Sequence, residues 1–255
     1  MRAPVLPELL PPELSPTAAV GLIILSFFTS VLTSVASIGG GITLISVMAI
    51  LLPPFIVLPV HGVVQLGSNG GRMWLMRKHI DKRITILFGL GALVGVAIAT
   101  RIFVTLSTQT LQLLLGAFIL FSVWTPTFKP SNLPDKAYPI VGMVATFCTM
   151  FVGAVGPFVA SFLSLERLQR HGVVATLSAC ATIQHTLKIF AFGYLGFQFK
   201  DWLVVMGAMV VMGFAGTWVG NRVLDKVPDQ LFQWLFRGVV TVLAIKLLWA
   251  GLTTS

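Results

Sequence analysis

Long apolar segments constrain this chain more than any other feature. Eight of them follow one another between short polar breaks, at about 18–51, 56–76, 84–106, 109–126, 138–165, 173–197, 202–221 and 230–253. A helix needs roughly 20 apolar residues to span a bilayer. Only 10% of the residues are charged, whereas soluble domains carry roughly 25%. The sequence therefore predicts an all-α polytopic membrane protein whose main surroundings are a lipid bilayer.

The formal net charge of +9 raises the possibility of a nucleic-acid partner. The Lys and Arg residues, however, lie in short clusters between the apolar segments, which is how membrane proteins fix their orientation. We therefore expect no nucleic-acid partner. Cys148 and Cys180 both fall within apolar segments, so we predict small buried packing residues rather than a disulfide framework, a metal site or a cofactor site.

The two halves of the chain resemble each other. SIGGGI at 37–42 aligns with GAVGPF at 153–158, an offset of 116, and the same offset aligns Asn69-x-x-Arg72 with His185-x-x-Lys188. STQTLQLLLGA at 107–117 aligns with PDQLFQWLFRG at 228–238, an offset of 121. We therefore predict an extramembrane lead-in at 1–17, a first transmembrane repeat at 18–126, a connecting loop at 127–137 and a second transmembrane repeat at 138–255.

The distribution of basic residues favours an inverted arrangement of these repeats. If the first segment of each half is a hairpin broken at its glycines and followed by three transmembrane helices, each half crosses the membrane an odd number of times. Ten basic residues then lie on one side and three on the other, and the richer side is expected to be cytoplasmic. The richer side would hold Arg77, Lys78, Lys82, Arg83, Lys129, Lys136, Arg167, Arg170, Arg222 and Lys226, and the other Arg2, Arg101 and Lys200. Long tilted single helices would use the same segment lengths, so that alternative stays open.

The two glycine turns are the first candidate parts of a site. Non-helical backbone at membrane depth either lines a cavity or is buried in protein, and the N-terminus of a half-helix favours an anionic group. The candidate residues are Ser37, Gly39, Gly40 and Gly41 in the first turn and Gly153 and Gly156 in the second. The same glycines could instead serve close helix packing.

Two basic residues inside apolar segments are the second candidate part of the site. Lys188 precedes Lys200 by 12 residues, or roughly 18 Å of helix, which places it near the middle of the bilayer. A charge there costs roughly 2.5 to 3.5 kcal/mol, so Lys188 should face a cavity or a partner rather than lipid. Arg72 could face it too, or could snorkel to the interface beside Arg77.

Neutral polar residues lie within two helical turns of these bases. They could donate hydrogen bonds to an oxyanion or hold the helices together, and they are Gln65, Ser68, Asn69, Gln184 and His185. His61, which follows Pro59 near a segment end, is expected at the membrane interface and is not included.

All eight carboxylates lie in the lead-in, in loops or at segment ends. No carboxylate is left to neutralise Arg72 or Lys188, and a buried cation without a counterion predicts an anionic substrate. The same pattern argues against cation transport and against a proton relay built on Asp or Glu. A coupled proton would then be carried by His185 or by the substrate itself.

These stretches resemble the TauE/SafE sulfite exporter family. The resemblance covers residues 20–250 and rests on SIGGGI, VVQLGSNGGR, GAVGPF, and TLSACATIQHTLK before FGYLGF. It implies a secondary transporter that moves sulfite, thiosulfate or an organosulfonate across the bacterial cytoplasmic (inner) membrane, driven by a proton gradient. A homo-oligomer is possible. The direction of transport is left open.

Two other functions compete with a transporter. An anion channel would carry the same residues but could not concentrate its substrate. An intramembrane lipid-phosphate enzyme would need an acid, a base or a nucleophile inside the membrane, and the sequence offers only His185 beside a Ser or Thr. We therefore predict alternating access about a site between the two halves, with no catalytic residue.

Overall fold

The computed structural model describes residues 10–36, 39–124, 133–223 and 229–253, and every regular element within these ranges is a helix. The first half holds α1 (Pro16–Ala36), α2 (Gly40–Leu51), α3 (Pro54–Leu75), the 3-10 turn η2 (Arg77–His79), α4 (Lys82–Phe103) and α5 (Thr108–Trp124). The second half holds η3 (Asp135–Ala137), α6 (Tyr138–Val152), α7 (Gly156–Ala160), α8 (Leu165–Tyr194), η4 (Phe199–Trp202), α9 (Leu203–Val223) and α10 (Asp229–Thr253). The predicted all-helical architecture is confirmed.

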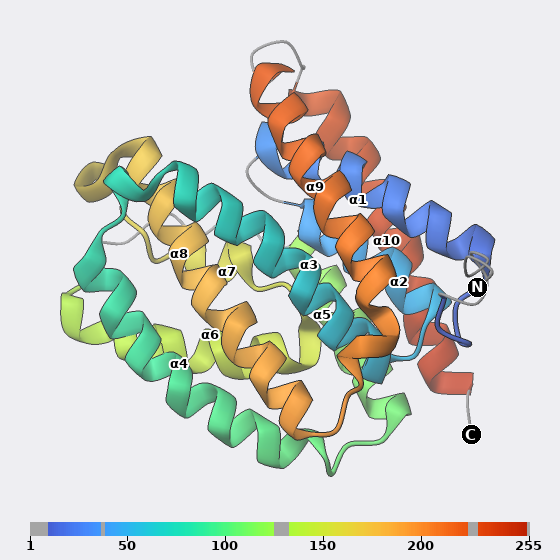
Figure 1. Ribbon diagram of the computed structural model, residues 1–255. Helices are drawn as coiled ribbons and strands as arrows, with labels where there is room; N and C mark the ends of the chain where they lie inside the picture. The colour runs from blue at the N-terminus through green and yellow to red at the C-terminus, as the bar shows by residue number, and fades with distance from the viewer. Residues whose placement is uncertain (1–9, 37–38, 125–132, 224–228, 254–255) are drawn as a thin grey trace, which may run out of the picture.

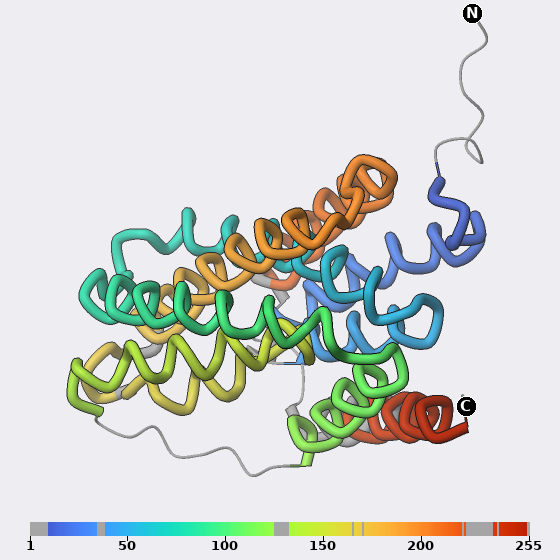
Figure 2. The backbone as a smooth tube through the Cα atoms, turned by 90° about the horizontal axis from the view of Figure 1, so that it is seen from below, coloured from blue at the N-terminus to red at the C-terminus, as the bar shows by residue number. Residues whose placement is uncertain are grey.

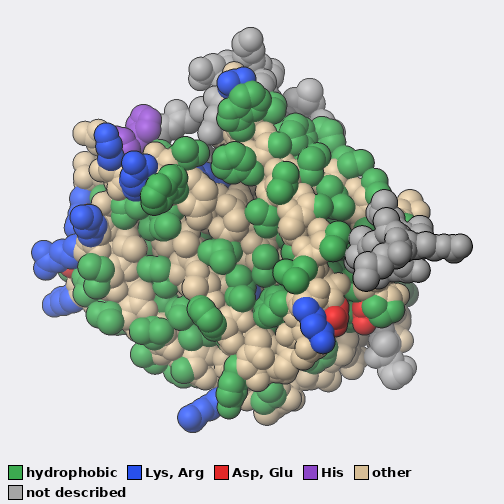
Figure 3. All heavy atoms as spheres, in the orientation of Figure 1, with side chains coloured by type: hydrophobic (Ala, Val, Ile, Leu, Met, Phe, Trp, Pro, Cys, Tyr) green, Lys and Arg blue, Asp and Glu red, His purple; other side chains and the backbone are tan. Residues whose placement is uncertain are grey.

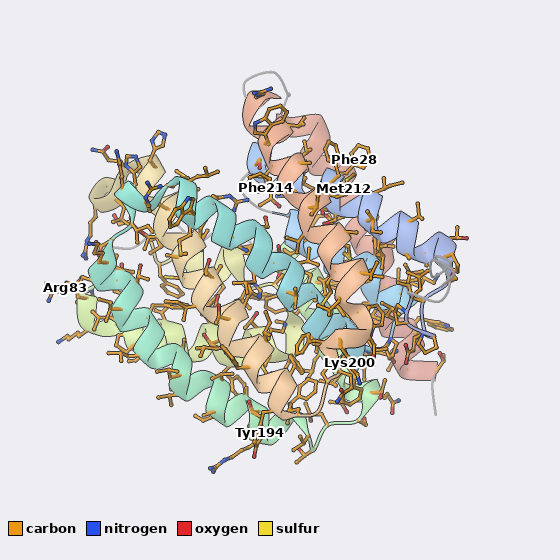
Figure 4. All side chains as sticks on the ribbon, viewed as in Figure 1. Phe28, Arg83, Tyr194, Lys200, Met212 and Phe214 are labelled. Atoms are coloured by element: carbon orange, nitrogen blue, oxygen red, sulfur yellow. The ribbon has the colours of Figure 1, made fainter. Side chains whose placement is uncertain are left out.

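Several helices are suited to a bilayer by length and composition. The stretches Pro16–Ser34, Lys82–Phe103, His171–Tyr194 and Phe199–Gly220 are long and apolar enough to cross a membrane. Large apolar side chains such as Phe28 and Phe214, labelled in Figure 4, are more than half exposed, and green apolar atoms are spread over the surface in Figure 3. An outer surface this apolar suits lipid, and the protein is a multi-pass membrane protein.

Both segments predicted as hairpins are broken at a glycine. The first breaks before α2, where Gly39 has φ 110° and ψ −33°, a conformation that residues with a Cβ rarely adopt. Figures 1 and 2 show α2 running back along α1. The second breaks at Gly153, which follows α6 with φ 79°. The chain then returns to the start of α6, because the Tyr138 hydroxyl donates to the Phe162 carbonyl over 3.2 Å. Neither segment is one continuous helix.

Each broken segment packs on a helix of the other half. A Cβ on Gly91 in α4 would collide with the Pro139 carbonyl of α6, and a Cβ on Gly216 in α9 would collide with the Phe27 carbonyl of α1. Glycine therefore brings the backbones of these helices together, as it does in many membrane proteins. The Ser26 hydroxyl of α1 adds a hydrogen bond of 2.8 Å to the Met209 carbonyl of α9.

The helices α3 and α8 lie antiparallel through the centre of the molecule. The rings of His61 and His185 are 6.3 Å apart between centroids, and those of His79 and His171, at one end of the pair, are 5.5 Å apart. Residue numbers increase along α3 in the direction in which they decrease along α8, so the two helices are antiparallel. This arrangement brings the polar residues near Arg72 together with those near Lys188.

Charged residues gather where α4 and α8 begin. Arg83 Nε lies 2.9 Å from an Asp135 carboxylate oxygen, and Arg167 pairs with both Asp135 and Asp81. The Arg167 guanidinium lowers the pKa of Asp135. Figure 4 places Arg83 at this end, whereas Lys200 lies by the start of α9. The basic segments 77–83 and 166–171, the second of which forms the first turns of α8, therefore meet at one end of the molecule.

Candidate anion-binding site

A cavity of about 80 Å³ lies between α3 and α8 and reaches both glycine turns. It has room for several water molecules or for a small oxyanion. Its lining residues are Thr33, Gly39, Gly41, Ile42, Gln65, Ser68, Asn69, Arg72, Thr149, Ala154, Val155, Gly156, Pro157, Leu177, Ala181, Gln184 and His185. Nine of the thirteen residues predicted from the sequence are among them.

Arg72 brings a charge without a counterion into this cavity. It lies in the last turn of α3 and is partly buried. Its Nη2 atom is buried and has no hydrogen-bond partner among the described residues. None of the lining residues is acidic. Arg72 therefore faces the cavity, rather than snorkelling only to the interface, and its guanidinium has a donor to offer to an anion.

Gln184 and His185 bring further unpartnered atoms from α8. Their side chains are 3% and 6% exposed, and the Gln184 Nε2 and His185 Nδ1 atoms lack hydrogen-bond partners within the described part of the chain. Buried polar atoms nearly always have a partner, and leaving one unsatisfied costs about 1 to 3 kcal/mol. Three such groups around one cavity indicate a ligand that would satisfy them.

The remaining polar residues of α3 support the wall of the cavity. The Asn69 side-chain amide donates 2.9 Å to the Gln65 carbonyl within its own helix. The Gln65 side-chain amide lies against Gly41, where a Cβ would collide with it. Ser68 lines the cavity between them. Gln65 therefore joins α3 to the start of α2, and Asn69 keeps its carbonyl oxygen and one N–H free of that bond.

The predicted glycines divide into two groups. Gly39, Gly41 and Gly156 line the cavity, whereas Gly40 and Gly153 pack against the Thr29 carbonyl and the Ile45 side chain. Ser37 lies outside the described residues. Among the described residues no side chain caps the N-terminus of α2, and Gly41 and Ile42 of its first turn line the cavity. The positive end of a 12-residue helix favours an anion there.

Lys188 lies behind the wall rather than on it. Its side chain is 0% exposed, and its Nζ donates 2.9 Å to the Thr149 carbonyl while lying 5.8 Å from the centroid of the Phe192 ring. The same carbonyl accepts from the Gly153 N–H over 3.0 Å. Lys188 thus caps the carbonyl end of α6, where a cation is favoured. Thr149 itself lines the cavity.

Sequence reasoning missed Thr33, Thr149 and His61. His61 was expected at the membrane interface, but it is 0% exposed, and its Nε2 lies 3.0 Å from the Gly41 carbonyl. The spacing carried a signal, because positions 61, 65, 68, 69 and 72 form one stripe at intervals of three and four residues along a helix. The two threonines carry no comparable signal in a membrane helix, where threonine commonly bonds to its own backbone.

Comparison with known proteins gave one family. The model of the family described as "Sulfite exporter TauE/SafE" matches residues 22–247, nearly the whole chain. No curated protein and no solved structure matches the chain.

Proposed function

The chain belongs to the sulfite exporter TauE/SafE family, and we propose that it is a secondary active transporter of sulfite, thiosulfate or an organosulfonate. The observation that carries this proposal is the cavity at which, within the described structure, Arg72, Gln184 and His185 have unpartnered polar atoms and no lining residue is a carboxylate. A small oxyanion would neutralise the charge and accept the free donors. The cavity is assigned a binding role, with no catalytic residue, metal or cofactor.

The packing of the helices supports two inverted repeats. In the proposed correspondence, α1 and α2 match α6 and α7, while α3, α4 and α5 match α8, α9 and α10. The contact of α4 with α6 then has its counterpart in the contact of α9 with α1. The central helices α3 and α8 are counterparts that run antiparallel, as an axis in the membrane plane requires. Transporters built in this way bind their substrate at the repeat interface.

The same arrangement supports alternating access. The cavity lies between α3 of one half and α8 of the other and touches a glycine turn from each. A rocking motion of the halves would therefore open it to one side and then to the other. We place the protein in a bacterial cytoplasmic membrane, with the end that holds Arg83 and Arg167 in the cytoplasm. The proposal is compatible with a homo-oligomer.

Proton coupling completes the proposal. A buried anion site can be driven by a pH gradient if a proton moves with the anion. The carboxylates whose side chains the structure describes lie outside the cavity, and they are Glu13, Asp81, Asp135, Glu166 and Asp201. The coupled proton must then be carried by a histidine or by the anion. The predicted proton gradient is consistent with either.

Flux into proteoliposomes tests this function. Wild-type protein is reconstituted and supplied with sulfite, thiosulfate, sulfoacetate, sulfate, phosphate or chloride, with and without an imposed pH gradient. Accumulation of a sulfur anion against its own gradient is expected. Passive equilibration that ignores the pH gradient would identify a channel instead. Absence of flux together with turnover of a lipid phosphate would identify an enzyme.

A further inference from the structure

Two histidines meet beside the cavity, on the two helices that cross at the centre. His61 of α3 and His185 of α8 have ring centroids 6.3 Å apart with an interplanar angle of 75°. His185 lines the cavity, whereas His61 lies one layer deeper and is fully buried. Both have a buried Nδ1 without a hydrogen-bond partner in the described structure. The proposed anion site includes His185 but assigns no role to His61.

The tautomer of His61 is set by its contact with α2. Its Nε2 lies 3.0 Å from the Gly41 carbonyl, and because a carbonyl can only accept, Nε2 must carry the proton. In a neutral ring Nδ1 then has a free lone pair. A buried lone pair with no donor near it is a site at which a proton can be added, and Gly41, whose carbonyl holds the ring, lines the cavity itself.

The other described titratable groups near the cavity are placed differently from these two rings. Arginine keeps its proton in proteins, which excludes Arg72 of α3. Lys188 and Cys180 of α8 are buried outside the cavity lining, and Lys188 is bonded to the Thr149 carbonyl. The helices α2 and α7 hold no titratable residue. The titratable residues of α6 are Tyr138, which is bonded to the Phe162 carbonyl at the far end, and Cys148, which is outside the lining. Those of α4 lie at its two ends.

We propose that His61 and His185 form the protonation site that couples anion movement to the proton gradient, taking up a single proton on one ring or the other. This inference rests on the proposed function. Lys188 follows His185 by three residues on α8, and its side chain lies beside Gly62, the residue after His61. Its charge, together with that of Arg72, makes an empty site unfavourable for a further positive charge. A second proton on the adjacent ring would be repelled in turn.

Binding of the anion removes this obstacle. A negative charge in the cavity lies next to His185 and offsets the fields of Arg72 and Lys188, so that the histidine pair can accept a proton. By linkage, the protonated pair binds the anion more tightly by the same factor. The loaded site therefore holds the anion and the proton together, and the two cross the membrane in the same direction. The proton enters from water on one side and leaves to water on the other.

The test separates coupling from anion movement. Proteoliposomes carrying wild type or His61→Gln are assayed for sulfite and thiosulfate in two ways: counterflow at equal pH, and accumulation driven by a pH gradient. Glutamine keeps an N–H donor for the Gly41 carbonyl but cannot take up a proton. We expect the ratio of driven accumulation to counterflow to fall at least tenfold in the variant. The matched control is His79→Gln with His171→Gln, which changes the other facing histidine pair, and its ratio should equal that of wild type.

Proton movement gives a second measurement that does not depend on a variant. Wild-type vesicles loaded with a pH indicator should take up about one proton for each thiosulfate that enters, since thiosulfate itself stays unprotonated near neutral pH. Driven accumulation that persists in His61→Gln, or thiosulfate entry without proton uptake, overturns the inference while the transporter remains. Failure of wild type to exchange either anion overturns the proposed function as well.

Discussion

Replacing Arg72 with glutamine should weaken anion binding strongly and leave folding intact. An anion about 4 Å from the guanidinium would gain roughly 4 kcal/mol at an effective dielectric constant of 20. Because Arg72 is only partly buried, solvent screening reduces this to about 2 kcal/mol. Glutamine removes the charge, so the KM for exchange should rise by roughly 30-fold.

Stability should respond in the opposite sense or not at all. Arg72 has no ion pair among the described residues, and its Nη2 is buried without a partner. Its removal therefore breaks no ion pair of the described structure and no hydrogen bond of Nη2, and an unsatisfied buried donor costs about 1 to 3 kcal/mol. The Tm of Arg72→Gln in detergent without anion should be equal to that of wild type or higher.

The assay is sulfite and thiosulfate exchange in proteoliposomes over a range of concentrations, with the thermal transition measured on the same preparations. The matched control is Arg101→Gln, which removes an exposed arginine from the last turn of α4, away from the cavity lining. A KM for Arg72→Gln within twofold of wild type would refute the assignment of Arg72 to the site. A large loss of Tm would refute the claim that the guanidinium is unpaired.

Three further predictions address the turn, the packing and the charged end. Gly41→Ala should push the Gln65 amide into the cavity and reduce the anion exchange rate at least tenfold. The Tm should change little, because the atom that the new Cβ meets is Gln65 Nε2, at the end of a flexible side chain. An unchanged exchange rate would contradict this prediction. Gly91→Val should lower Tm by several degrees, since its Cβ meets backbone and overpacking costs roughly 1 to 3 kcal/mol, whereas Gly207→Ala, with nothing within 4 Å, should not. The pKa of Asp135 is lowered by its contact with Arg167. The stability that this pair adds is therefore present above the ordinary Asp pKa of about 3.9. It is lost as the pH falls through the lower pKa that Asp135 has in the folded protein. The Tm difference between wild type and Asp135→Asn should therefore shrink as pH falls, and a difference that grows would reverse the assignment.

Much of the site could be predicted from the sequence because placing a charge in lipid is unfavourable in free energy. This limits the directions in which the Arg72 side chain can point. An arginine among apolar residues must face a cavity, a partner or the interface. Because no acidic residue lies within the apolar segments, an acidic partner was excluded. The same reasoning located the glycine turns, since glycines clustered in the middle of a long apolar segment indicate a break. The structure confirms both breaks.

Lys188 shows what this reasoning cannot supply. Its position within a segment indicates that it avoids lipid, but a lysine can satisfy its charge equally well against an anion or against the open carbonyls at a helix end. Which one it meets depends on where α6 ends relative to α8, a tertiary relation that no local pattern encodes. His61 was misplaced for a related reason: burial of a residue near a segment end depends on α2 folding back over it.

The contact between α1 and α9 also has a consequence for how the protein is made. Ser26 and its acceptor Met209 are 183 residues apart, and at roughly 5 to 20 residues per second the ribosome needs about 10 to 40 s to supply the partner. During that interval the Phe27 backbone and the Ser26 hydroxyl of α1 have no α9 to pack against. The first hairpin must therefore wait in the lipid or beside the insertion machinery, and its final fold is completed only when the second half of the chain arrives.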